Sequence, residues 1–384
     1  MALSASRRGS VPPFIAMDML RAAAERAAAG ADVIHLELGQ PATPAPAAVR
    51  KAARRALAQD RLGYTEALGT AALRRAIAAH YGAQYGLRFE PAEVVVTTGS
   101  SAGFLLAFLA AFEAGDRVAL AAPGYPAYRN ILSALGLEPV LIPVDRSVHY
   151  QPTPELLAAC GRLAGLIIAS PANPTGTMIG EQELGRLAAY CREHGIRLVS
   201  DEVYHGITYE RPAATARAWD EEAIVVNSFS KYYSMTGWRL GWLLVPPQLR
   251  RPIECLAQNL YVSPPALSQL AAPAAFGCRE ELDDHVARYR RNRDLLLDSL
   301  RAAGLRRFAP AEGAFYLYAD ISELREDSTA FCRRLLAETG VAVTPGWDFD
   351  PIGGGEWIRL SYAGDSAEIA EAARRLKEWL PRAG

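Results

Sequence analysis

The chain has 384 residues and a mass of 41.5 kDa, enough for two or three domains of about 150 residues each. Half of its residues are hydrophobic and 22% are charged, which excludes a globally disordered chain. The 41 basic and 42 acidic side chains nearly cancel. This balance gives no electrostatic reason to expect binding to nucleic acid or to an anionic membrane.

The cysteines and the hydropathy pattern indicate a cytoplasmic location. Five cysteines are scattered along the chain without a Cys-x-x-Cys pair, which is typical of a reducing cytoplasm. The longest apolar run, residues 104–112, is far shorter than the roughly 20 residues that a membrane span needs. The N-terminal segment MALSASRRGSVPP has no apolar stretch typical of a signal peptide. We therefore expect a cytoplasmic protein without a membrane span.

The first part of the chain alternates helical patterns with breaks. Alanine, leucine and methionine at helical spacing predict a helix over residues 13–30, ended by Gly30. A short strand is expected at 33–39, before a proline-rich break at 41–46. Helical patterns return at 47–59 and 70–82.

A strand and helix alternation begins near residue 93. Seven short runs rich in apolar and β-branched residues predict strands at 94–99, 117–124, 139–144, 165–171, 196–202, 223–230 and 241–246. Helical patterns separate many of them, at 102–113, 125–135, 154–163 and 181–194. Several runs are apolar on both faces, as in strands covered on two sides. The pattern predicts an α/β fold with a mostly parallel sheet wrapped by helices.

The last hundred residues mix both types of element. A long helical pattern at 285–304 ends at Gly304, and strands are expected at 314–321 and 357–363 with two further helices. The arginines of the long helix are diluted by aspartates, so we interpret them as a solvated face rather than a nucleic-acid stripe. We expect an N-terminal arm and part of a small domain at 1–46, a large domain at 47–280 and the rest of the small domain at 281–384.

Lysine is scarce in this chain. Only three of the 41 basic residues are lysines, Lys51, Lys231 and Lys377, and the other 38 are arginines. A GC-rich genome would explain such a bias without any role in function. A neutral lysine amine can form a Schiff base, whereas arginine stays protonated and cannot.

Three segments place polar residues at the carboxyl ends of predicted strands, where open α/β sheets build their sites. They are SPANPTG (170–176) with Asn173, LVSDEVY (198–204) with Asp201 and Tyr204, and NSFSKYYSMTGWRLGW (227–242) with Lys231 and Arg239. Taken singly, a proline-rich loop, a buried structural aspartate and a surface lysine would explain them. Their occurrence together favours a site.

A fourth segment, TTGSSAGF (97–104), runs from a strand into a helix. The free N–H groups of a helix start, with the hydroxyls of Ser100 and Ser101, suit a phosphate. The segment lacks the Gly-Lys-Ser/Thr of a P-loop, and the chain has no G-x-G-x-x-G, so ATP and NAD are poorly supported. A phosphate seat, a Schiff-base lysine, a carboxylate and a phenol together suit pyridoxal phosphate, and we expect no metal ion.

The sequence resembles the class I/II (fold type I) pyridoxal-phosphate-dependent aminotransferases, the aspartate aminotransferase superfamily. The motifs NPTG, SDEVY, SFSK and GWRLGW occur in the family's order, and the likeness runs from LELGQP to WIRLSYA. The resemblance implies a large domain with a mostly parallel seven-stranded sheet and a smaller α+β domain built from both chain ends. It also implies ping-pong transfer of an amino group between an L-amino acid and a 2-oxo acid through a Lys231 Schiff base.

The resemblance also implies a role for each matching cofactor residue. Asp201 would pair with the pyridine nitrogen, and Asn173 and Tyr204 would contact the ring's 3-oxygen. Tyr125 would stack on the ring. The phosphate would be bound by Ser100, Ser101, Ser228 and Arg239, with Ser230 as a helper.

The resemblance further implies substrate contacts and a partner. Arg359 would grip the substrate α-carboxylate as a bidentate fork, close to the backbone of Gly39. Tyr64 would reach the phosphate of a neighbouring subunit, so the resemblance implies a homodimer with shared active sites.

Other functions and the substrate stay open. A carbon–sulfur β-lyase uses the same core motifs, whereas a regulator with an added DNA-binding domain is disfavoured because the likeness begins near the start of the chain. Dicarboxylate substrates need a second cation, and some relatives place a lysine where this chain has Ser100, Ser101 and Ala102. We favour a hydrophobic or small substrate side chain, with Phe14, Ile15 and Tyr316 as expected pocket walls.

Overall fold

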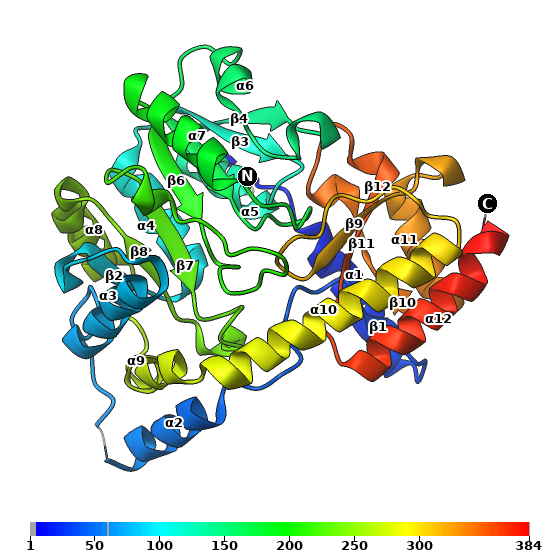
Figure 1. Ribbon diagram of the computed structural model, residues 1–384, viewed down its shortest axis with the longest axis horizontal. Coiled ribbons are helices and arrows are strands. Elements are labelled where there is room, and N and C mark those ends of the chain that lie inside the picture. Colours follow the sequence, from blue (N-terminus) through cyan, green and yellow to red (C-terminus); the bar gives the residue numbers. More distant parts are fainter. Residues whose placement is uncertain (1–4, 60, 384) are drawn as a thin grey trace, which may run out of the picture.

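A seven-stranded sheet forms the centre of the larger part of the molecule in the computed structural model, which describes residues 5–59 and 61–383 (Figure 1). The strands are β2 (Val94–Thr97), β3 (Arg117–Ala122), β4 (Glu138–Pro143), β5 (Gly165–Ala169), β6 (Arg197–Asp201), β7 (Ile224–Ser228) and β8 (Gly241–Leu244). Their order is β2-β8-β7-β6-β5-β3-β4, and only β8 runs antiparallel to its neighbours. These are the seven predicted runs, with ends shifted by one or two residues, so the predicted α/β fold is confirmed.

Helices cover both faces of this sheet because successive strand residues point to opposite sides. In β5, Leu166 and Ile168 join one buried cluster and Ile167 joins the other. One cluster contains residues of α3 and α7, and the other contains residues of α4, α5 and α8. The helices of this part are α2 (Ala47–Gln59), α3 (Ala71–Tyr85), α4 (Gly99–Ala111), α5 (Pro126–Leu135), α6 (Pro154–Ala158), α7 (Glu181–Glu193), α8 (Pro247–Leu260) and α9 (Ala266–Ala271).

The two ends of the chain share a separate core. Its elements are α1 (Ile15–Ala28), β1 (Ile34–His35), α10 (Arg279–Ala302), β9 (Tyr316–Asp320), α11 (Ser328–Thr339), β10 (Val341–Ala342), β11 (Thr344–Pro345), β12 (Trp357–Ser361) and α12 (Ser366–Ala383). Strand β1 pairs in parallel with β10, and β11, β12 and β9 form an antiparallel sheet. Met19 and Ile34 pack in the same buried cluster as Phe331 and Leu360. The domain boundaries at 46 and 280 stay a prediction.

Several elements differ from their predicted extents. The strand expected at 33–39 is reduced to Ile34–His35, because the carbonyl groups of Glu37 and Gly39 bind side chains instead of a neighbouring strand. The helix expected at 154–163 ends at Ala158, and α10 starts six residues earlier than its predicted pattern. Helices α8 and α9 were not predicted. None of the helices in the described residues is long and apolar enough to cross a membrane.

Candidate active site

A cavity of about 340 Å³ lies where the large sheet meets the part built from the two chain ends. Its walls include most of the predicted site residues: Gly39, Ser100, Ser101, Tyr125, Asn173, Asp201, Tyr204, Ser230, Lys231, Arg239 and Arg359. Asp201 ends β6, and Asn173 and Lys231 lie in the loops that follow β5 and β7, so all three lie at the edge of the sheet where the carboxyl ends of these strands meet. A larger cavity of about 600 Å³ has none of the predicted residues in its walls. We therefore locate the site in the smaller one.

The Lys231 amine is held in place by a hydrogen bond and has a lowered pKa. Its Nζ donates a hydrogen bond to the carbonyl oxygen of Gly39 at 2.7 Å and lies 5.8 Å from the ring centres of both Tyr204 and Phe315. Burial, followed by the positive charge of Arg359, lowers the pKa of Lys231 to about 8, although Asp201 opposes the shift. A larger fraction of the amine is therefore neutral near pH 7 than for an ordinary lysine, as nucleophilic and basic roles require.

Asp201 is a buried carboxylate with two donors. Its Oδ1 accepts the N–H of Val203 at 3.0 Å, and its Oδ2 accepts the hydroxyl of Tyr128. Burial raises the pKa of Asp201 to about 6, while the hydrogen bonds from Tyr128 and Val203 favour the charged form. Tyr128 was missed in the sequence, although it lies in the first turn of α5, only three residues after Tyr125.

Replacing Tyr128 with phenylalanine should raise the pKa of Asp201 further, because a hydrogen bond to the charged carboxylate is lost while its burial remains. The sequence predicts that Asp201 acts in its ionised form, so we expect the acid limb of kcat/KM against pH to move to higher pH, by about one unit. Tyr209→Phe is the matched control, because the Tyr209 hydroxyl donates to Ala314 away from the cavity. Overlapping profiles for the two variants would contradict this role.

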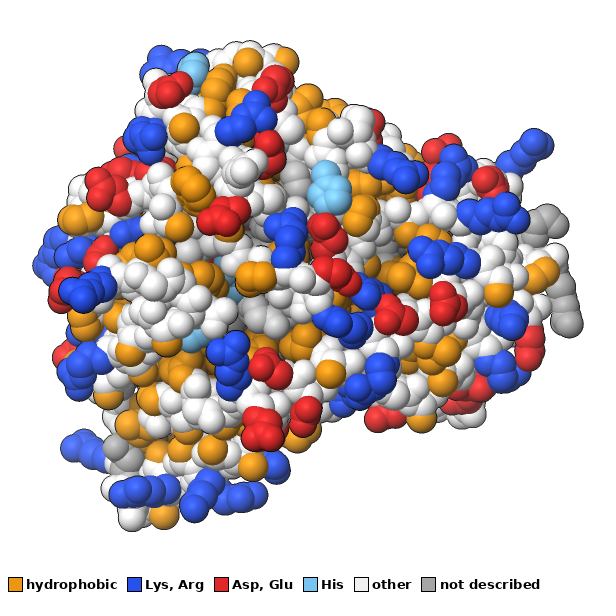
Figure 2. Space-filling model, in the orientation of Figure 1, with side chains coloured by type: hydrophobic (Ala, Val, Ile, Leu, Met, Phe, Trp, Pro, Cys, Tyr) orange, Lys and Arg blue, Asp and Glu red, His pale blue; other side chains and the backbone are white. Residues whose placement is uncertain are grey.

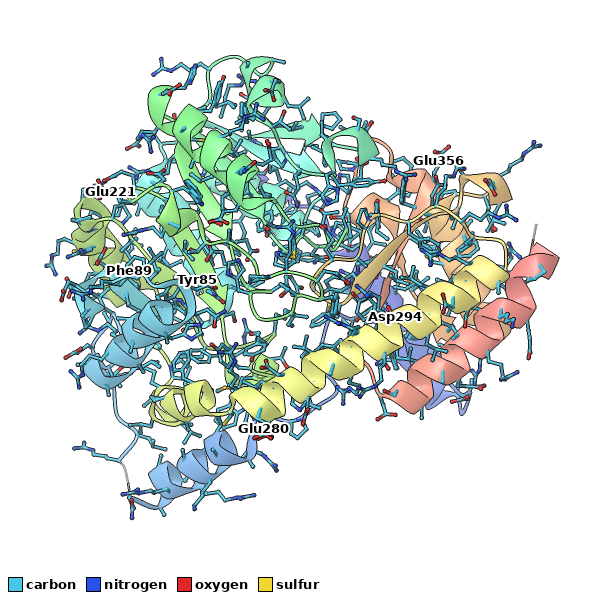
Figure 3. The ribbon with its side chains drawn as sticks, viewed as in Figure 1. Tyr85, Phe89, Glu221, Glu280, Asp294 and Glu356 are labelled. Carbon is cyan, nitrogen blue, oxygen red and sulfur yellow. The ribbon has the colours of Figure 1, made fainter. Side chains whose placement is uncertain are left out.

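Tyr204 and Gly39 are both packed against Tyr316. The hydroxyls of Tyr204 and Tyr316 lie 2.7 Å apart. A Cβ at residue 39 would lie 1.7 Å from the Tyr316 hydroxyl, so only glycine allows this approach. The loop that carries Tyr204 is also held by a contact outside the cavity. The hydroxyl of Tyr85, which is labelled in Figure 3 at the end of α3, lies 2.7 Å from Nδ1 of His205 in this loop.

Arg359 is buried and oriented from several sides. Its Nη1 donates to Asn173 Oδ1 at 3.0 Å, and its Nη2 donates to the carbonyl oxygen of Glu37. The rings of Tyr316 and Phe349 lie 4.5 and 4.6 Å from its Cζ. Its Nε is buried and has no hydrogen-bond partner in the described residues. A buried donor of this kind is suited to a ligand carboxylate.

Ser100, Ser101 and Arg239 converge at the start of α4. A Cβ at Gly99 would lie 2.4 Å from Arg239 Nη2, and one at Gly241 would lie 3.0 Å from the backbone nitrogen of Ser100. Glycines thus let the helix start and the guanidinium lie close together, where N–H groups and positive charge favour an anion.

Two predicted residues lie outside the cavity walls. Ser228 is buried behind them, where its hydroxyl accepts the N–H of Ser230 at 3.0 Å and lies 3.1 Å from the carbonyl oxygen of Leu240. It therefore supports Ser230 in this chain rather than facing the cavity. Tyr64 is 87% exposed.

Of the expected pocket walls, Phe14 and Tyr316 line the cavity and Ile15 does not.

The arrangement fits pyridoxal phosphate. Lys231 provides an amine with a lowered pKa, and Asp201 provides a buried carboxylate that forms no ion pair within the described residues. The glycine-flanked start of α4 provides a binding site for an anion. Arg359 offers its unpartnered Nε beside them.

Comparisons with known proteins agree with this chemistry. Residues 31–376 match the family model for aminotransferases of class I and II. The chain belongs to this family. The enzyme is 55% identical to the valine–pyruvate aminotransferase of Mycobacterium tuberculosis, over 97% of this chain and 98% of that protein.

Solved structures of relatives have the same fold. The crystal structure of an aminotransferase from Mycobacterium tuberculosis superimposes with a TM-score of 0.97 at 54% identity, covering 99% of this chain and 100% of that one. The aspartate aminotransferase of Thermus thermophilus with maleate gives a TM-score of 0.93 at 32% identity, with 100% of both chains covered. The enzyme is thus a pyridoxal-phosphate-dependent aminotransferase, and the predicted family, activity and cofactor are confirmed.

Proposed function

We propose that the enzyme transfers the amino group of a small branched aliphatic amino acid, such as valine, to pyruvate by a ping-pong mechanism. The observation that carries this proposal is the character of the cavity walls. Apart from the polar residues already described, they are mostly apolar or aromatic and include Phe14, Ala16, Met17, Leu38, Phe104, Tyr125, Tyr316 and Phe349. Such walls favour an aliphatic side chain over a charged one.

The cations of the cavity support the same substrate class. In the part of the chain that the structure describes, Lys231, Arg239 and Arg359 are the basic residues of the walls. Each has a role in holding cofactor or α-carboxylate, so a second carboxylate would be left without a cation. The relative that is 55% identical carries the name valine–pyruvate aminotransferase, which agrees with this proposal.

The residues would divide the chemistry as follows. When bound, pyridoxal phosphate supplies an electron sink that makes the substrate α-proton acidic. Asp201 would hold the positive charge of the ring nitrogen, and the start of α4 with Arg239 would hold the phosphate. Arg359 would bind the α-carboxylate and so fix the orientation of the α-carbon. The neutral amine of Lys231 would take the α-proton and return it to the cofactor side.

The proposal is tested with the purified enzyme, pyridoxal phosphate, valine and pyruvate, with alanine and 2-oxoisovalerate measured as products. We expect parallel lines in double-reciprocal initial-rate plots and a valine kcat/KM well above those of aspartate and glutamate. A dicarboxylic donor used more efficiently than valine would overturn the substrate assignment. Ammonia and pyruvate released from cysteine conjugates, without transamination, would instead support the lyase.

We further propose that the enzyme is a homodimer with shared active sites. Tyr64 is almost fully exposed in one chain, and Leu57, Leu260 and Val262 are exposed apolar residues of the same part of the molecule. Figure 2 shows hydrophobic side chains gathered at its lower left, over α2 and α9. An apolar hollow lined by Leu105, Ile131, Leu135 and others shares Ser101 with the active-site cavity. A second copy of this chain on that surface would complete the site.

Mixing two inactive variants tests the shared site. Lys231→Ala and Tyr64→Ala subunits, exchanged at random, should form sites that combine an intact Lys231 with an intact Tyr64 from the other subunit. We expect about a quarter of the sites, and of the wild-type activity, to be restored. Light scattering should give twice the 41.5 kDa chain mass. A monomer, or a mixture no more active than its components, would contradict shared sites.

A further inference from the structure

Helix α1 starts without a cap from its own sequence. The residue before it, Phe14, makes no side-chain hydrogen bond to the helix. The first N–H groups of a helix need acceptors. Here the N–H of Ile15 donates to Asp348 Oδ1 at 2.9 Å, and that of Ala16 donates to Asp348 Oδ2 at 3.1 Å. A carboxylate more than 330 residues later in the chain therefore caps α1.

The segment that carries this carboxylate is itself tightly held. Asp348 is 1% exposed, and its carbonyl oxygen accepts a hydrogen bond from Arg129 at 2.6 Å. A Cβ at Gly346 would lie 2.4 Å from the carbonyl oxygen of Gly354, so the two glycines bring the ends of this loop together. The carbonyl of Phe349 also accepts the N–H of Gly124 at 3.0 Å. Asp348 thus presents its carboxylate to α1 from a fixed position.

The capped end of α1 forms one wall of the active-site cavity. Phe14, Ala16 and Met17 line it together with Asp348. The Phe14 ring lies 5.9 Å from the ring of Tyr125. The N-terminus of α1 therefore bounds the same cavity as Arg359.

We infer that Asp348 is a positioning residue that docks α1 over the cavity and thereby sets the preference for the substrate side chain. The part of this inference that names valine rests on the proposed function. The docking of α1 by Asp348 does not, and it has its own measurement.

Asp348→Asn tests the docking, because an amide can accept only one of the two N–H groups and turns its own NH₂ toward the other. We expect hydrogen exchange at the start of α1 to accelerate by on the order of tenfold. The ratio of kcat/KM for valine to that for alanine should fall by about tenfold, mainly through a higher KM for valine. Asp350→Asn is the matched control, because Asp350 lies in the same loop and is not a cavity wall, and within the described residues its carboxylate accepts a hydrogen bond from the N–H of Ile352 alone.

A second pair of variants removes the donor instead of the acceptor. Ile15→Pro deletes the N–H that binds Asp348, and proline is compatible with the first position of a helix. The extended backbone of Phe14 already suits a following proline (φ −75°, ψ 117°). Ile15→Ala shortens the same side chain but keeps the N–H, so it is the control. We expect the proline variant to repeat the effects of Asp348→Asn and the alanine variant to lack them.

The outcomes separate the two proposals. The role of Asp348 would be overturned if Asp348→Asn and Ile15→Pro both left two quantities unchanged. These are hydrogen exchange at the start of α1 and the ratio of kcat/KM for valine to that for alanine. Equal losses for valine and alanine, together with a lower Tm, would also overturn it, since they would indicate a general packing defect. Hydrogen exchange at the start of α1 could be faster in the variants while the wild-type enzyme does not use valine. This result would support the docking of α1 by Asp348 and reject the proposed substrate.

Discussion

Lys231→Ala should lower the rate of transamination by on the order of 10⁴-fold or more, because it removes the amine that we propose both attaches the cofactor and moves the α-proton. Lys231→Arg should be similarly inactive. Its guanidinium keeps the positive charge but cannot become a neutral base. The measurement is single-turnover conversion of valine to 2-oxoisovalerate with a saturating amount of pyridoxal phosphate.

The control for Lys231 is Lys377→Ala, since Lys377 is exposed on α12 and lies outside the cavity. It should retain wild-type activity. Borohydride reduction should fix pyridoxal phosphate to the wild-type chain and to Lys377→Ala, but not to Lys231→Ala. A covalent label on Lys51 or Lys377 would show that the amine has been assigned to the wrong residue.

Arg359→Ala should lower kcat/KM for valine by on the order of 10³-fold, because it removes the buried guanidinium that we propose binds the α-carboxylate. Arg359→Lys should recover only part of this loss, since an ammonium cannot form the planar fork that carboxylates match. Steady-state kinetics with valine as the varied donor measures both losses.

Isobutylamine is the matched substrate for Arg359, because it is valine without the carboxylate. The Arg359 variants should lose little of whatever turnover the wild-type enzyme has with this amine. Arg374→Ala is the variant control, since Arg374 lies at the surface and forms ion pairs with Glu371 and Glu378. Equal losses for valine and isobutylamine would mean that Arg359 supports the fold of the cavity rather than the carboxylate.

Local patterns were sufficient to predict the large sheet. Its strands are short apolar runs, many of them separated by helical patterns, and burial on both faces makes such runs easy to recognise. The polar residues at their carboxyl ends were found for the same reason. Asp201 ends β6, Asn173 and Lys231 lie in the loops that follow the neighbouring strands β5 and β7, and all three line the cavity.

Contacts between distant parts of the chain could not be predicted in this way. Nothing in the residues around Tyr204 indicates Tyr316, and nothing around Ile15 indicates Asp348, because each pair meets only through tertiary packing. The strand expected at 33–39 was too long for a related reason. Two of its carbonyl groups bind Arg359 and Lys231, and their apolar surroundings look the same in the sequence as those of a strand.

The docking of α1 on Asp348 has a consequence for biosynthesis. The first helix of the chain emerges early from the ribosome, yet Asp348, which caps it, is synthesised more than 330 residues later. Arg359, which binds the carbonyl of Glu37, is synthesised later still. A nascent chain can form strands of the large sheet as they emerge, but it cannot close the substrate pocket until almost all of its length has been translated. We therefore expect that ribosome-bound chains arrested before residue 346 lack substrate binding.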